Sequence, residues 1–283
     1  MYVWKQLSPS VEHRLAQGRA FGMTDTGTVR PSNEDNFLID AHLGLLAVAD
    51  GMGGHEGGEV ASSDALIAIA HFLRARLASG ALGAHARATP RLGDVARHDG
   101  DATWTDSSIS AMRTVHDAIE FANQAMYQTN LENRRREGGM GTTLTGMWQA
   151  QPGGPAVVFH VGDTRLYRLR EGRLDQLTRD QTMYQHALDN GASANLPARN
   201  LLMQAIGPSS SIRPELQIHH VAPGDLFMLC SDGLHGTVEP HHLQALLAGA
   251  TSGDLGATCA ELIDTAKQQG SRDNITVVLF HCA

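Results

Sequence analysis

Short apolar runs separated by polar turns make up much of the chain. Residues 36–39 and 45–49 are apolar and flank the polar stretch 40–44, a pattern that predicts a β-hairpin. Further apolar runs predict strands at 141–149, 156–161, 165–170, 173–177, 214–221, 225–230 and 274–281. Because these strands follow one another in groups, we expect most of them to pair antiparallel.

Four other segments repeat apolar residues every three or four positions, which predicts helices. The first covers residues 58–76. The second begins near 105–106, where an N-cap is available, and ends at the glycines 138–139. The last two cover 239–249 and 254–269. Grouped strands with helices in blocks are typical of an α+β fold, in which packed antiparallel sheets are covered by helices.

Two segments show no clear period. Residues 78–105 are rich in Gly, Ala, His and Asp, and we expect an exposed irregular loop there. Residues 180–211 are polar, and we expect them to be partly helical and mobile. Neither a linker composition nor an internal repeat divides the chain, so we expect a single domain over residues 1–283.

Composition excludes several classes of protein. The 283 residues carry 30 acidic and 22 basic side chains, a formal net charge of −8, which argues against a nucleic-acid partner. The three cysteines are far apart in sequence, so neither a disulfide framework nor a thiolate zinc site is indicated. An export signal is not evident, and the longest apolar stretch, near 65–73, is too short to span a bilayer. We therefore expect a cytoplasmic protein without membrane contact.

The predicted hairpin brings two carboxylates together. Pairing Asp40 with Leu45 places Asp35 opposite Asp50, with Cβ atoms roughly 4.5 to 5.5 Å apart. Carboxylates at that distance repel each other unless a proton or a cation lies between them. Glu34 adds a third carboxylate nearby. The alternative interpretation is that these are ordinary turn residues, since Asp, Asn and Gly favour turns.

Three more aspartates stand at the ends of predicted strands. Asp163 and Asp232 follow apolar runs, and Asp273 precedes one. Five strand-end aspartates could converge at one end of a sandwich, where all-oxygen ligands would select Mg²⁺, Mn²⁺ or Ca²⁺. Two such ions can activate a water and hold a phosphoryl oxygen, so that hydrolysis needs no protein nucleophile. Arg30 could bind the phosphate through a bidentate fork, or it could be a surface arginine in a polar loop.

Six short motifs occur in a recognisable order: VRPSNED at 29–35, DGMGGH at 50–55, GTT at 141–143, VGDTR at 161–165, SDG at 231–233 and RDN at 272–274. They resemble the metal-dependent serine/threonine protein phosphatases of type 2C, especially the compact bacterial members. The resemblance runs from about residue 22 to 280. It implies a central sandwich of two antiparallel β-sheets flanked by helix pairs, in four layers.

The resemblance also implies a metal centre that holds two Mn²⁺ or Mg²⁺ ions, with a weaker site for a third. Asp50 would bridge the first two ions, and the backbone carbonyl of Gly51 would bind one of them. Asp232 and Asp273 would complete the other. Asp163, with Asp232, would hold a weaker third ion.

Further roles follow from the same resemblance. Glu34 and Asp35 would hold metal-bound waters, and Arg30 would bind the phosphate. Met52 stands where animal members have a histidine proposed as general acid, so His55 or a metal-bound water is left as the proton donor. Another departure is Gln181, where the family commonly has a histidine. Residues 181–207 would form a flap beside the cleft that varies with the substrate.

Three functions remain open at this level. The first is hydrolysis of phosphoserine and phosphothreonine in proteins, by a monomer that opposes a serine/threonine kinase and acts on the kinase or its substrates. The second is a catalytically silent module that binds phosphoproteins; such a relative would be expected to have lost aspartates, and none is missing at the matched positions. The third is hydrolysis of small phosphate esters, which uses the same chemistry at phosphorus.

Overall fold

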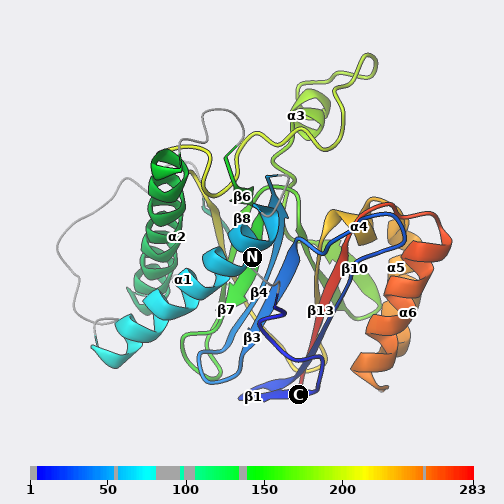
Figure 1. The fold of residues 1–283 in the computed structure, drawn as a ribbon. Helices are drawn as coiled ribbons and strands as arrows, with labels where there is room; N and C mark the ends of the chain where they lie inside the picture. The colour runs from blue at the N-terminus through cyan, green and yellow to red at the C-terminus, as the bar shows by residue number, and fades with distance from the viewer. Residues whose placement is uncertain (1–4, 54–56, 81–95, 99–105, 134–138, 251–252) are drawn as a thin grey trace.

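The computed structural model describes residues 5–53, 57–80, 96–98, 106–133, 139–250 and 253–283 (Figure 1). Two β-sheets form its centre. The first has the strand order β1 (His13–Leu15), β2 (Gly18–Asp25), β13 (Ile275–Cys282), β12 (Leu226–Cys230), β9 (Arg165–Arg170) and β10 (Arg173–Gln176). The second has the order β3 (Asp35–Asp40), β4 (Leu45–Met52), β7 (Leu144–Trp148), β8 (Ala156–Val161), β11 (Glu215–His219) and β5 (Ala96–His98), and β6 (Gly141–Thr142) pairs with β4.

Helices cover the outer face of each sheet, as Figure 1 shows. On one side, α1 (Gly58–Ala78) and α2 (Asp106–Glu132) share an apolar core with the second sheet. On the other side, α5 (Pro240–Ala250) and α6 (Leu255–Gln268) share a core with the first sheet. These four layers confirm the predicted α+β sandwich flanked by helix pairs.

A third apolar cluster fills the space between the two sheets. Its largest fully buried side chains are Phe37 of β3, Phe227 of β12 and Phe280 of β13. The rings of Phe227 and Phe280 are stacked, with centroids 6.3 Å apart. Apolar side chains are therefore buried on both faces of both sheets. Their burial stabilises the sandwich and fixes how the strand ends meet at its rim.

Several predicted elements were wrong in detail. The N-terminal strands β1 and β2 were not predicted, because glycine and polar residues interrupt the apolar pattern of residues 13–25. The segment 78–105 contains β5, which pairs parallel with β11; the rest of that predicted loop lies mostly outside the described residues. The predicted strand 141–149 divides at Thr143, whose N–H donates to the carbonyl of Asp50 (2.9 Å).

The remaining helices are short. The segment 180–211 was predicted to be partly helical, and α3 (Met183–Asp189) lies in it; α4 (Asp232–His235) follows β12 directly. Thr182 caps α3, because its hydroxyl accepts the N–H of Gln185 (3.0 Å). Within the described ranges, none of the helices has the length and apolar character that crossing a bilayer requires.

Candidate active site

The hairpin β3–β4 has the predicted register. Asp35 pairs with Asp50, and Phe37 pairs with Val48 two positions further along. Because residues two apart share a face, both carboxylates lie at the rim of the apolar space between the sheets. Asp35 is buried, with 1% of its surface exposed.

Strands of the other sheet bring two more aspartates to the same rim. Cys230, the last residue of β12, pairs with Val277 of β13, so Asp232 and Asp273 lie just beyond this pair. The loops that carry them pack closely: a Cβ on Gly233 would lie 2.0 Å from the carbonyl oxygen of Asn274. The lack of a side chain at position 233 therefore allows the two carboxylate-bearing loops to approach.

The turn between β8 and β9 supplies Asp163. It begins with Gly162 at φ 101°, in the region that favours glycine. Arg165, at the start of β9, pairs with Cys230, which places the turn beside the end of β12. Asp163 is buried, with 7% of its surface exposed.

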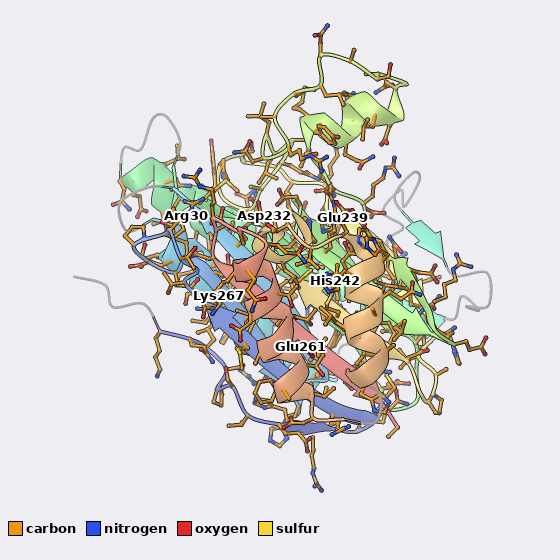
Figure 2. All side chains as sticks on the ribbon, turned by 90° about the vertical axis from the view of Figure 1, so that its right-hand side faces the viewer. Arg30, Asp232, Glu239, His242, Glu261 and Lys267 are labelled. Carbon is orange, nitrogen blue, oxygen red and sulfur yellow. The ribbon has the colours of Figure 1, made fainter. Side chains whose placement is uncertain are left out.

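Hydrogen bonds orient part of this acidic cluster. The hydroxyl of Thr276 donates to Asp35 Oδ2 (2.7 Å), and the guanidinium of Arg30 donates through Nη2 to Asp273 Oδ2 (2.7 Å). Arg30 is half exposed, and Figure 2 shows it at the same end of the molecule as Asp232. It therefore lies at the rim of the cluster, where its remaining N–H groups face outward.

Burial and mutual repulsion favour the protonated forms of these acids. Burial is the main cause that raises the pKa of Asp35 to about 7, Asp163 to about 7 and Asp232 to about 6, and nearby carboxylates raise these values further. The pKa of Asp50 is raised well above its usual range by burial and by its neighbour Asp35. Burial also raises the pKa of Glu34. Groups perturbed in this way are candidates for a functional site.

The donor set fits a hard divalent cation. The Oδ1 atom of Asp232 is buried without a hydrogen-bond partner, a costly state that a bound ion would relieve. The carboxylates of Asp50 and Asp273 and the backbone of Gly51 offer further oxygens of the kind that Mg²⁺ and Mn²⁺ prefer. Among the described residues, no group of three such side chains is close enough to hold an ion without adjustment.

The backbone of Gly51 is held from two sides. Its N–H donates to the carbonyl of Glu34 (3.2 Å), across the hairpin end. A Cβ on Gly51 would lie 2.0 Å from the carbonyl oxygen of Gly58, at the start of α1. The missing side chain therefore lets α1 begin directly beside the acidic cluster.

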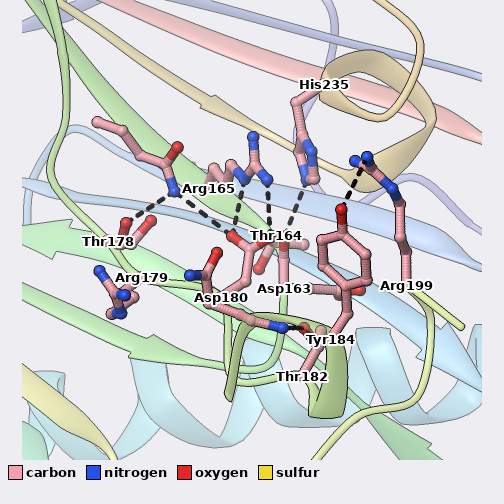
Figure 3. A network of polar contacts seen from close by, with 12 residues as sticks. Asp163, Thr164, Arg165, Thr178, Arg179, Asp180, Thr182, Tyr184, Arg199 and His235 are labelled. Carbon is pink, nitrogen blue, oxygen red and sulfur yellow. Dashed lines mark hydrogen bonds and ion pairs between the residues drawn. The ribbon is translucent and has the colours of Figure 1, made fainter. Parts of the chain in front are cut away.

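A network behind Asp163 was not predicted as functional. Figure 3 shows Arg165 bound to Asp180 by two hydrogen bonds of 2.7 Å, from Nε to Oδ1 and from Nη2 to Oδ2. The ring Nε2 of His235 lies 2.9 Å from the carbonyl oxygen of Asp163. Burial lowers the pKa of His235 to about 3, so the ring is neutral and donates to that carbonyl. In the sequence, only the positions of these residues could have pointed to them: Arg165 lies in the VGDTR motif, and His235 lies one helical turn after Asp232.

The structure brings the predicted site residues together at one rim. Aspartates 35, 50, 163, 232 and 273 lie at converging strand ends, with Glu34, Gly51 and Arg30 beside them. Met52, in place of a histidine, is the last residue of β4. His55 lies outside the described residues.

Comparisons with known proteins agree with this arrangement. Residues 31–276 match the family model for protein phosphatase 2C. The serine/threonine protein phosphatase PstP of Mycobacterium tuberculosis is 34% identical over 264 residues, which cover 90% of this chain and 43% of PstP. The chain thus spans less than half the length of that relative. The serine/threonine phosphatase stp of Listeria monocytogenes is 29% identical, with 90% of this chain and 92% of the relative covered.

A solved structure supports the fold and the type of cofactor. The catalytic domain of PstP in complex with two manganese ions superposes with a TM-score of 0.72 at 30% identity, and the match covers 94% of this chain and 98% of that one. Its fold and the ions it holds match the sandwich and the oxygen donors described above. Together with the match over residues 31–276, this shows that the chain belongs to the protein phosphatase 2C family.

Proposed function

We propose that this protein is a Mn²⁺- or Mg²⁺-dependent phosphatase that hydrolyses phosphoserine and phosphothreonine in other proteins. The observation that carries the proposal is the meeting of buried aspartates from both sheets around the unpartnered Oδ1 of Asp232. Membership of the protein phosphatase 2C family supports it. We further infer that residues 1–283 act as one phosphatase domain, as a cytoplasmic monomer that opposes a serine/threonine kinase.

Oxygen atoms of several residues would hold the metal ions. Asp50, Asp232, Asp273 and the carbonyl of Gly51 would hold two ions, and Asp163 with Asp232 would hold a weaker third. When bound, the ions supply a water of lowered pKa and positive charge beside the phosphate.

Other side chains would orient the reactants. Glu34 and Asp35 accept hydrogen bonds and so would orient water in the cleft. Arg30, at the rim, would bind the phosphate through the N–H groups that Asp273 does not use. Met52 has no proton to donate, so the departing serine or threonine oxygen would take its proton from water or from another group.

A phosphate-release assay tests the proposal. We expect Mn²⁺ to give turnover of phosphoserine and phosphothreonine peptides, EDTA to stop it, and added Mn²⁺ to restore it. Phosphotyrosine peptides should be much poorer substrates, and no phosphorylated enzyme should accumulate, because water attacks directly. Activity that survives EDTA, or a phosphate trapped on a side chain, would contradict the mechanism.

The same assay separates the alternatives. A silent binding module would bind the peptides without releasing phosphate. A hydrolase of small esters would release phosphate from a small aryl phosphate but not from the peptides. The complete set of aspartates favours the active protein phosphatase over the silent module.

A further inference from the structure

Gln181, the first residue of the flap, contacts the turn that carries Asp163. Its backbone N–H donates to the carbonyl of Gly162 (2.7 Å), and its side-chain Oε1 accepts the N–H of the same residue (2.9 Å). Both polar groups of the Gly162 backbone are therefore paired with one residue. Gln181 is positioned to set the conformation of the residue that precedes Asp163.

Gln181 also connects the two ends of the flap, through its backbone and its side chain. The carbonyl of Gln181 accepts the N–H of Met203 (2.8 Å), and its Oε1 accepts a second hydrogen bond, from Nε2 of Gln204 (2.9 Å). Thr182 and Leu202 form an antiparallel bridge between these contacts. We call residues 181, 182, 202, 203 and 204 the flap neck, because they join the two ends of the flap.

Gln204 anchors the outgoing end of the neck. Its Nε2 donates to the carbonyl of Arg213 (2.7 Å), and its Oε1 accepts the N–H of Arg213 (3.1 Å). The side-chain amide of Gln204 thus bonds the backbone of Arg213, while the side-chain amide of Gln181 bonds the Asp163 turn. The Nε2–Oε1 hydrogen bond between the two glutamines connects these two anchors.

The Asp163 turn has little freedom on its other sides. A Cβ on Gly162 would lie 2.7 Å from Cγ2 of Thr143, so this side of the turn is filled. The carbonyl of Asp163 accepts the ring N–H of His235, from α4 (2.9 Å). The turn is therefore held between α4 and Gln181, and a change at Gln181 is transmitted to Asp163.

We propose that Gln181 is a positioning residue that fixes the Gly162–Asp163 turn and couples it to closure of the flap neck through Gln204. This proposal rests on the proposed function. It adds a structural link between the flap, which would face the substrate, and the acidic cluster. An amide suits the position because it offers a donor and an acceptor at every pH. A carboxylate there would add a like charge near Asp163, and an apolar side chain would leave the Gly162 N–H unpaired.

Amide hydrogen exchange on the metal-free protein tests the coupling without using activity. Gln181→Met removes the side-chain hydrogen bonds at nearly constant volume, and we expect exchange to become about tenfold faster in peptides that contain Gly162 and in those that contain Met203. Gln204→Met should accelerate exchange around Met203 and, to a smaller extent, at Gly162, because the Gln181 side chain that accepts the Gly162 N–H loses its hydrogen bond from Gln204. The matched control is Gln185→Met, on the same flap, since the Gln185 side chain donates only to Asp189 among the contacts found for it.

Kinetics on the Mn²⁺-loaded protein provide the second measurement. Gln181→Met should lower kcat several-fold on both a phosphopeptide and a small aryl phosphate, because it displaces Asp163. Gln204→Met should mainly raise KM for the phosphopeptide and lower kcat less than Gln181→Met does, because it loosens the flap neck directly and reaches the Asp163 turn only through Gln181.

The outcomes separate this proposal from the proposed function. Unchanged exchange at Gly162 in Gln181→Met, or an equal effect of Gln185→Met, would overturn the coupling even if the enzyme is active. A wild-type protein without phosphatase activity would overturn the function, while the exchange data would still decide the coupling. If Gln181→Met does not fold, Gln204→Met decides: an unchanged exchange rate at Gly162 while Met203 exchanges faster, or no change at either, would overturn the coupling.

Discussion

Asp50→Asn should abolish turnover in Mn²⁺ while the protein still folds. The amide has nearly the shape of the carboxylate but lacks its charge, so it cannot bridge two cations. We expect a loss on the order of a thousandfold or more, since the ions supply the activated water and the charge beside the phosphate. Asp232→Asn should have a comparable effect, because it replaces a charged ligand with a neutral amide that has only one oxygen to offer. Phosphate release from a phosphothreonine peptide measures both.

The control for this prediction lies on the same hairpin. Asp40 ends β3 at the opposite end from Asp35, and its carboxylate pairs with the exposed Arg74 (2.7 Å). Asp40→Asn should therefore retain near-normal turnover, since exposed ion pairs contribute little. In the metal-free protein above neutral pH, Asp50→Asn should also raise the melting temperature, because the amide is neutral without the proton that the buried Asp50 takes up beside Asp35. Near-normal rates in Asp50→Asn would remove the basis of the proposed chemistry.

The metal-free protein should lose stability as the pH rises from 6.5 to 8, above the range in which the buried His160 and His235, whose pKa values burial lowers, give the opposite trend. The folded state raises the pKa of Asp35 and Asp163 to about 7, above their values in the unfolded chain. Between the two pKa values the folded state binds more protons than the unfolded state, so the free energy of unfolding falls with increasing pH. The stabilising effect is complete below the unfolded pKa and is lost as the pH passes about 7.

Thermal unfolding in EDTA at pH 6.5, 7, 7.5 and 8 measures this effect. We expect the melting temperature to fall by about 5 °C or more over this range. Saturating Mn²⁺ should remove most of the fall at pH 7 and 8, because the ions replace the protons between the carboxylates. A melting temperature that rises with pH in EDTA would show that the carboxylates do not repel one another in the folded protein.

Local periodicity was enough to predict the elements that carry the first two carboxylates. The alternation of residues 36–39 and 45–49 sets a register with period two, and a slip by one residue would have turned Phe37 out of the core. The structure confirms that Asp35 faces Asp50. The helix pairs were likewise predicted from their apolar spacing; the ends of α1, α5 and α6 differ from the prediction by one or two residues, whereas α2 ends at Glu132, several residues before the predicted end at 138–139.

The contacts that were missed depend on residues far apart in sequence. The strand β2 has a weak pattern of its own and is held by eight pairings with β13, at the other end of the chain. The short β5 is paired with β11 rather than defined by its own residues. Gln181 was singled out only as a departure from the family, and its contacts with Gly162 and Gln204 appear only when the flap ends meet. Non-local pairing of this kind leaves no periodic signal.

Diffraction from a crystal soaked in Mn²⁺, recorded for anomalous scattering, tests the central claim most directly. We expect two strong peaks, one for each Mn²⁺ ion, at the rim of the sandwich. Both ions should contact Asp50; one should also contact the carbonyl of Gly51, and the other Asp232 and Asp273. Peaks elsewhere, or the absence of peaks at this rim while the carboxylates remain apart, would contradict the proposed metal centre.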